Sequence, residues 1–238
     1  MEALILYFVL FFPGVNAWSA IISLAPGVVG GAEAIRTIPF SIIRELGRTI
    51  THSLPGIALL LYLISGKSSD KVSAVPPGDK SFRLLKATIP AKRDIIPFVI
   101  GLPVLIIIGL FVSFLASLFA RLYGGFSPPL LIEGPYSFWG WVVLILACLG
   151  TGYLEEIYFR YYLLTKTESL IPSPALRVVF SVLLFAVSHI HDGPWGVINA
   201  ALAGLFLSAL FLRYRSLHGI ALAHAGYNFF VYAMGAVG

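Results

Sequence analysis

Long apolar stretches follow one another along the whole chain, and they constrain its fold more than any other feature. A helix needs about 20 mostly apolar residues to cross the roughly 30 Å of hydrocarbon in a membrane. Seven stretches meet or approach this length, at residues 3–24, 45–65, 95–120, 138–164, 175–192, 195–212 and 216–236. The sequence therefore predicts an all-α, polytopic transmembrane helix bundle of about seven spans, with residues 1–238 forming a single membrane domain.

The composition excludes an ordinary soluble domain. Apolar residues make up 58% of the chain and charged residues 11%, with a mean hydropathy of +0.92, whereas soluble domains are about 45–50% apolar. The net charge of +5 does not indicate a nucleic-acid partner, because the basic residues gather in loops between the apolar stretches. The single cysteine, Cys148, has no partner in the chain and is expected to be a small core residue.

The distribution of basic residues predicts the orientation of the bundle. The N-terminus lacks the basic region of a signal peptide, so residues 3–24 are expected to remain as a first span. If the basic loop at 66–94 is cytoplasmic, eleven basic residues lie inside and four outside, which favours a cytoplasmic N-terminus. The inner residues are Lys67, Lys71, Lys80, Arg83, Lys86, Lys92, Arg93, Lys166, Arg177, Arg213 and Arg215, and the outer ones are Arg36, Arg44, Arg48 and Arg121. The absence of a transit peptide suits a prokaryotic cytoplasmic membrane.

Four ionisable residues interrupt the apolar stretches at similar depths. Glu155 and Glu156 lie side by side in one stretch, and two others carry His189 and His224. Because burying a charge in a bilayer costs at least a few kcal/mol, such residues are candidates for function. At 1.5 Å per residue, Glu155, His189 and His224 lie roughly 15, 21 and 12 Å from the predicted inner ends of their helices. Ordinary helix tilt makes these heights overlap, so one site near the middle of the membrane is predicted.

The spacing within each helix gives these residues different roles. Glu156 and Arg160 are four residues apart, so they share a helix face and are expected to form an ion pair. Glu155 points about 100° away from that face. One glutamate is therefore neutralised and the other is left for chemistry. His224 and Asn228 are also four apart, so an imidazole and a carboxamide project into the same space.

Three short motifs, in this order on successive helices, resemble a known family. They are Glu-Glu-x-x-x-Arg at 155–160, Phe-x-x-x-His at 185–189 and His-x-x-x-Asn at 224–228. The set resembles the CPBP family of intramembrane proteases, which includes the CAAX-processing endopeptidase Rce1 and bacterial Abi proteins. The resemblance covers roughly residues 138–230, which are expected to be the catalytic core helices. Phe185, one turn before His189, is expected to hold the histidine ring in place.

The residues point to water as the nucleophile. Ser188 adjoins His189, but neighbours on a helix diverge by about 100°, and Cys148 lies about two turns from Glu155. Neither pairs with a histidine as an activated nucleophile would. The resemblance implies that Glu155 and His189 activate the water. His224 and Asn228 are expected to donate hydrogen bonds to the oxyanion.

The predicted catalytic residues are Glu155, His189, Glu156, His224 and Asn228, with Arg160 as the ion-pair partner. Glu156 and Arg160 are expected to hold the site together. Spacing alone leaves open which glutamate is the general base. The predicted enzyme is thus a membrane-embedded, glutamate-type endopeptidase acting on a peptide or lipidated protein. The resemblance includes CAAX processing of prenylated substrates, but the motifs do not separate this use from cleavage of other peptides, and they leave the oligomeric state open.

Three alternatives remain at this point. No cofactor is expected, but in a metal-assisted variant Glu155, His189 and His224 would bind zinc and leave a fourth position for water; the His-Glu-x-x-His helix signature is absent. Some Abi-type relatives are non-catalytic membrane scaffolds or bacteriocin self-immunity proteins, although the motif residues are intact here. A proton-coupled transporter would also carry carboxylates and histidines at mid-membrane, but the chain shows no repeated halves.

The remaining polar residues are assigned to structure or to the surface. These include three further histidines: His52, His191 and His218. Ala200, Gly204 and Ser208 recur at four-residue steps and predict a helix face of small residues for close packing. Arg44 and Arg48 are expected to extend their charged ends to a membrane interface.

Overall fold

The computed structural model describes residues 2–11, 37–38, 40–66, 91–123, 131–132, 134–135 and 137–235, and almost all of this part is helical. The helices are α1 (Glu2–Leu10), α3 (Ile42–Arg48), η1 (Thr49–Ser53), α4 (Leu54–Gly66), η2 (Lys92–Asp94), α6 (Ile95–Tyr123), α7 (Phe138–Glu156), η3 (Ile157–Tyr162), α8 (Leu163–Lys166), α9 (Pro174–Ser188), η4 (Ile190–Asp192), α10 (Gly193–Tyr214) and α11 (Leu217–Gly235). Two strands of two residues, β1 (Thr37–Ile38) and β2 (Leu131–Ile132), pair in parallel. The all-α prediction is confirmed.

Within the described residues, three continuous helices are long and apolar enough to cross a membrane. They are Lys92–Leu122, Phe138–Lys166 and Ile190–Tyr214, and α9 is a shorter apolar helix. The protein is therefore an integral membrane protein. The count of seven spans and the cytoplasmic N-terminus stay predictions. Of the predicted first span at 3–24, residues 12–24 lie outside the described residues, as does the loop at 66–94 between residues 67 and 90.

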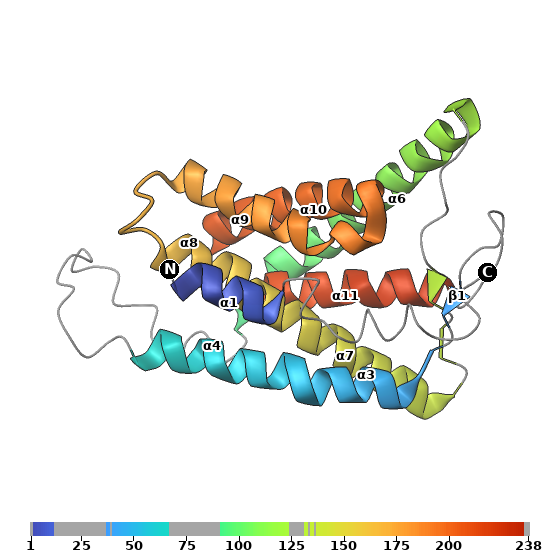
Figure 1. The fold of residues 1–238 in the computed structure, drawn as a ribbon, viewed down its shortest axis with the longest axis horizontal. Coiled ribbons are helices and arrows are strands. Elements are labelled where there is room, and N and C mark those ends of the chain that lie inside the picture. The colour runs from blue at the N-terminus through green and yellow to red at the C-terminus, as the bar shows by residue number, and fades with distance from the viewer. Residues whose placement is uncertain are drawn as a thin grey trace.

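Helix α11 lies in the middle of the bundle. In Figure 1 it runs between two groups of helices: α7 with α3 and α4 on one side, and the hairpin of α9 and α10 on the other. Small residues let its neighbours approach closely: a Cβ atom on Gly152 of α7 would lie 3.0 Å from the Ala221 carbonyl oxygen and from the Ala225 nitrogen. On the other side, a Cβ atom on Gly101 of α6 would lie 2.8 Å from the Ala223 Cβ. Side chains from α11 therefore meet α7 at short range, as in other close helix contacts in membranes.

The second predicted span forms one continuous helix from Ile42 to Gly66, although charged residues interrupt its apolar sequence. Glu45 is buried, and its carboxylate lies 3.0 Å from the Arg44 Nε and 2.8 Å from the Arg48 Nη2. The two arginines thus neutralise a buried acid, a contact that the sequence analysis did not predict. Their extension to a membrane interface stays a prediction.

Helix α9 ends earlier than the predicted stretch at 175–192. Ser188 is its last residue, His189 caps it, and a short 3-10 turn leads to Gly193. Gly193 has a φ angle of 77°, a left-handed conformation that glycine adopts without strain, and it reverses the chain into α10. His189 therefore lies at the end of a helix and not inside one. The exposed position expected for His191 is confirmed.

Two wide π-helical turns, η1 and η3, interrupt long helices, and the sequence analysis did not predict either one. Turn η3 directly follows the two glutamates of α7. Around it, the Ser181 hydroxyl donates to the Phe159 carbonyl at 2.7 Å, and the Tyr158 hydroxyl donates to the Ala3 carbonyl of α1 at 2.6 Å. Single π turns are rare and often mark functional sites. Both turns pack next to the polar residues described below.

Candidate active site

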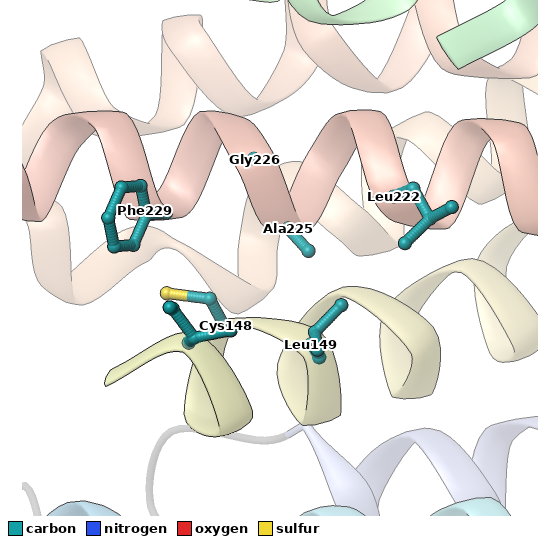
Figure 2. A pocket seen from close by; sticks show the side chains of 7 residues that line it. Cys148, Leu149, Leu222, Ala225, Gly226 and Phe229 are labelled. Carbon is teal, nitrogen blue, oxygen red and sulfur yellow. The ribbon is translucent and has the colours of Figure 1, made fainter. Parts of the chain in front are cut away.

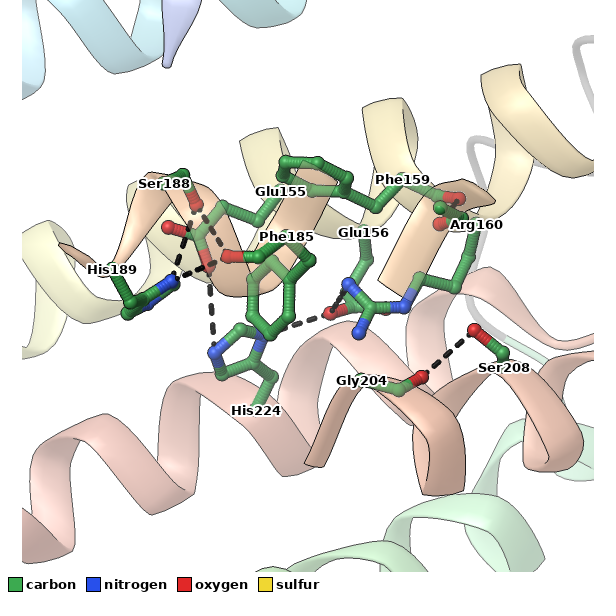
Figure 3. A network of polar contacts seen from close by, with 11 residues as sticks. Glu155, Glu156, Phe159, Arg160, Phe185, Ser188, His189, Gly204, Ser208 and His224 are labelled. Carbon is green, nitrogen blue, oxygen red and sulfur yellow. Dashed lines mark hydrogen bonds and ion pairs between the residues drawn. The ribbon is translucent and has the colours of Figure 1, made fainter. Parts of the chain in front are cut away.

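Carboxylates from α7, an imidazole from α11 and a guanidinium from η3 form one buried network, shown in Figure 3. Glu156 is completely buried, and its Oε1 atom lies 3.0 Å from the Arg160 Nη1. The ion pair expected from the four-residue spacing is present. The same oxygen lies 2.7 Å from the His224 Nδ1, so a second helix contributes to holding this carboxylate.

His224 bridges the two glutamates. Its Nδ1 faces Glu156, and its Nε2 lies 3.5 Å from the Glu155 Oε2. Carboxylate oxygens near both ring nitrogens favour the charged imidazolium, and the contact with Glu156 is the one short enough for a hydrogen bond. With His224 charged, two carboxylates meet one imidazolium and the Arg160 guanidinium, so the buried set is neutral. Such balance is what makes buried charges tolerable.

Glu155 is the more accessible of the two carboxylates. Its side chain is 14% exposed, whereas that of Glu156 is 0% exposed. The Glu155 Oε2 atom is buried and accepts no hydrogen bond from the described residues. The Oε2 atom of Glu156 likewise has no hydrogen-bond donor among the described residues, so the two glutamates differ in exposure and in the contacts that Arg160 and His224 make with the Glu156 Oε1.

The hydrogen bonds of His189 determine which of its nitrogens carries a proton. Nδ1 lies 2.9 Å from the Phe185 carbonyl oxygen and 3.1 Å from the Ser188 Oγ. A carbonyl oxygen only accepts, so Nδ1 is the donor and the neutral ring keeps a lone pair on Nε2. His189 is thereby prepared to accept a proton at Nε2.

A family model described as "Type II CAAX prenyl endopeptidase Rce1-like" matches residues 137–230. Through this segment, which is less than half of the chain, the protein is similar to the Rce1-like family. The family consists of CAAX-type membrane proteases, which agrees with the apolar helices of this protein. Comparisons with the curated proteins and with the solved structures gave no significant match. All residues of the network lie inside the Rce1-like segment, whereas α1, α3, α4 and α6 lie outside it.

The Phe185 ring contacts three other side chains of the site. Its ring centroid lies 4.7 Å from that of His189 and 5.9 Å from that of His224, and the Arg160 Cζ lies 4.4 Å above the ring. The expected contact with His189 is present, but the contacts with the other two groups were not foreseen. A cation over an aromatic face is stabilised by the ring quadrupole.

The predicted small-residue face of α10 makes room for this arrangement. Ala200, Gly204 and Ser208 are all buried. A Cβ atom on Gly204 would lie 2.9 Å from the Phe185 Cδ1 and 3.5 Å from the Arg160 Nη2. The small-residue face of α10 therefore packs directly against Phe185 and Arg160. The four-residue spacing of its residues in the sequence predicted this face.

The other predicted residues are less closely associated. Asn228 lies one turn along α11 from His224 and is partly exposed. No three His, Cys, Asp or Glu side chains in the described part of the chain are grouped as metal ligands. Glu155 and His224 face each other, and His189 bonds a backbone carbonyl through Nδ1, which leaves its Nε2 outside that bond. The metal-assisted alternative, with Glu155, His189 and His224 as ligands, stays a prediction.

An apolar groove runs beside the site between α7 and α11 (Figure 2). Its volume is about 260 Å³, and it is lined by Ile145, Cys148, Leu149, Leu222, Ala225, Gly226 and Phe229. Cys148 is free and buried, as expected for a small core residue. Ala225 of the lining follows His224 in sequence, but neighbours on a helix diverge by about 100°, so the two side chains leave α11 in different directions.

Proposed function

We propose that this protein is an intramembrane endopeptidase that hydrolyses a peptide bond with water activated by Glu155 and His189. The observation that carries the proposal is the convergence of two carboxylates and an imidazole from separate helices in a buried, charge-balanced network. A structural scaffold has no need for such a set, because charges in the membrane are expensive to bury. The match of residues 137–230 to the Rce1-like family model supports the same reaction class.

Glu155 is the proposed general base. It is the more exposed glutamate, and one of its oxygens has no hydrogen-bond donor among the described residues. His189 assists through Nε2, the nitrogen left unprotonated by the bond to the Phe185 carbonyl. Glu156 and Arg160 hold His224 in place. Proton transfer by a positioned base of this kind typically accelerates a reaction by about 10²–10⁴-fold.

In the proposed reaction, the water oxygen forms a bond to the substrate carbonyl carbon and its proton passes to Glu155. The 3.5 Å contact between His224 and Glu155 weakens once Glu155 is neutral. The His224 Nε2 proton is then available to the oxyanion, together with the Asn228 carboxamide. Each such donor is commonly worth about 3 kcal/mol in the transition state. The carbon–nitrogen bond then breaks, and Glu155 returns the proton to the amine product.

The substrate class that fits best is a lipidated peptide of the CAAX type, cleaved close to its prenylated residue. The groove between α7 and α11 supports this, because its lining is apolar and it is formed by the two helices that carry Glu155 and His224. Burial of an apolar chain there is favourable by about 25 cal/mol per Å². The peptide portion would then extend toward the carboxylates, where it meets the activated water.

The test is cleavage of a farnesylated CAAX peptide by the purified protein in proteoliposomes, with the released tripeptide measured by mass spectrometry. Glu155→Gln and His189→Gln are expected to reduce cleavage by about 10²-fold or more. Glu168→Gln is the matched control, since this glutamate is exposed and far from the network. Wild-type rates in folded Glu155→Gln protein would refute the mechanism. Binding of the peptide by wild-type protein without cleavage would favour a non-catalytic scaffold.

A further inference from the structure

Ser188 is the last residue of α9, directly before His189, and its side chain is buried. Val187 and Ile190, on either side of this pair, are both exposed. A buried hydroxyl is nearly always hydrogen-bonded, because leaving it unpaired away from water costs free energy. The partners of the Ser188 hydroxyl therefore indicate what it does in the site.

Three polar atoms at the end of α9 form a closed triangle, shown in Figure 3. The Ser188 Oγ lies 2.7 Å from the Phe185 carbonyl oxygen and 3.1 Å from the His189 Nδ1, and the carbonyl oxygen lies 2.9 Å from the same Nδ1. The carbonyl can only accept, so the hydroxyl donates to it and Nδ1 supplies the second proton of the triangle. Without a proton on Nδ1, two lone pairs would face each other at 2.9 Å. The Nδ1–H is thus shared between two acceptors, the Phe185 carbonyl and the Ser188 Oγ.

The His189 ring depends on these acceptors because it lies beyond the last turn of α9. Its ring meets that of Phe185 edge to face, with the centroids 4.7 Å apart. An apolar contact of this kind restrains the plane of the imidazole but does not select which way round the ring lies, since only the hydrogen bonds of the nitrogens do that. In a ring turned by half a rotation, a carbon atom would take the place of Nδ1 and both acceptors would lose their donor.

We propose that Ser188 is a positioning residue of the active site: its hydroxyl, bonded to the Phe185 carbonyl, accepts the His189 Nδ1–H and so keeps Nε2 free to receive a proton. The inference rests on the proposed function and adds a residue to it. It also gives a reason why Ser188 is not the nucleophile. The hydroxyl proton is directed at a carbonyl oxygen, and the neighbouring Nδ1 already carries a proton and cannot remove another. Ser188 therefore acts through His189 and does not touch the substrate.

The first test separates positioning from packing by kinetics. Ser188→Ala removes one of the two acceptors and leaves the Phe185 carbonyl, so we expect kcat for the farnesylated peptide to fall by about tenfold while KM stays within about twofold. Ser188→Thr keeps the hydroxyl and is expected to restore most of kcat.

Ser181→Ala is the matched control for this test. Ser181 is also buried on α9, but its hydroxyl donates to the Phe159 carbonyl at 2.7 Å. This variant is expected to lower the melting temperature and to leave kcat unchanged. The assignment is overturned by an unchanged kcat in Ser188→Ala, by an equal loss in Ser181→Ala, or by no recovery in a folded Ser188→Thr variant. Complete loss of cleavage in folded Ser188→Ala, as for a nucleophile, would overturn it too.

The second test observes the tautomer without any substrate. Nitrogen NMR of protein carrying isotope-labelled histidine distinguishes protonated from unprotonated ring nitrogens, and the signals missing from His189→Gln assign this residue. In the neutral wild-type ring we expect a proton on Nδ1 and none on Nε2, whereas Ser188→Ala adds a population with the proton on Nε2. A wild-type proton on Nε2, or the same spectrum for both proteins, would overturn the inference. Failure of wild-type protein to cleave the peptide overturns the proposed function instead, so the two results are distinguishable.

Discussion

At the scale of single residues, the site depends on how two adjacent glutamates become different. Both begin as equal members of one apolar helix, and the partners brought by other helices separate them. Glu156 is enclosed by Arg160 and His224, whereas Glu155 is partly exposed. In the proposed mechanism Glu156 stabilises the site and Glu155 acts as the base, a division of roles that carboxylate pairs show in many enzymes.

Replacing each glutamate in turn checks this division. Glu155→Gln is expected to abolish cleavage with little change in the melting temperature, because its contacts are long. Glu156→Gln is expected to lower the melting temperature, since it leaves Arg160 buried without a charged partner, at a cost of about 3–5 kcal/mol. Thermal unfolding in detergent and the peptide cleavage assay measure both effects. The reverse pattern would exchange the roles of the two residues.

Arg160 offers a second residue-scale prediction. Arg160→Met removes the ion pair with Glu156 and the contact over Phe185, so the free energy of unfolding should fall by about 3–5 kcal/mol. Arg160→Lys keeps the charge but not the planar group, and we expect only partial recovery. The control is Arg213→Met, because Arg213 is exposed on α10. Unfolding by denaturant gives the comparison, and equal stability of the Arg160 and Arg213 variants would contradict the prediction.

Metal removal gives a third prediction at the residue scale. Because the described residues present no set of three grouped metal ligands, we expect cleavage to persist after incubation with 1,10-phenanthroline and exhaustive dialysis. Metal analysis of the dialysed protein provides the control. Loss of cleavage that returns on adding zinc would support the metal-assisted variant, in which Glu155, His189 and His224 bind the ion.

Spacing along one helix predicts contacts within that helix, and these were found: the pair Glu156 and Arg160, and the edge-to-face contact of Phe185 with His189. It does not predict how helices rotate against each other. For this reason the bridge from His224 to both glutamates was missed, and His224 had been expected only to stabilise an oxyanion.

At the scale of elements, close contact between α7 and α11 determines the geometry of the site. Gly152 permits that contact, and it lies three residues before Glu155. The apolar stretches predicted most helix limits to within a few residues. The wide turns η1 and η3 were not predicted, because no apolar period marks a single extra residue. The early end of α9 depends on Gly193, whose left-handed conformation the sequence only suggests.

Gly152 gives a prediction at the scale of elements. Gly152→Ala places a methyl group 3.0 Å from backbone atoms of α11, so it should destabilise the protein by about 1–3 kcal/mol and reduce cleavage by shifting His224. Gly47→Ala is the matched control, because a Cβ atom there meets nothing within 4 Å. In the interior of a helix this control is expected to be neutral or stabilising by up to about 1 kcal/mol. Equal melting temperatures for the two variants would argue against close α7–α11 packing.

At the scale of the whole molecule, the orientation in the membrane is the main open prediction. Glu168 and His191 are both exposed and lie near opposite ends of α9. In a cysteine-free Cys148→Ser background, Glu168→Cys is expected to react with a membrane-impermeant maleimide only after permeabilisation, and His191→Cys in intact cells. This outcome follows from the excess of basic residues on the inner side. Labelling of both from the same side, or the opposite result, would contradict the predicted topology.

The early end of α9 has a consequence for the supply of solvent. Its 15 residues span roughly 22 Å, less than the roughly 30 Å of a typical hydrocarbon core. The bilayer beside so short a helix thins locally, and its headgroup region comes closer to the helix end. His189 stands at that end. Water for hydrolysis would then reach His189 from this thinned part of the leaflet, without a long pore through the protein.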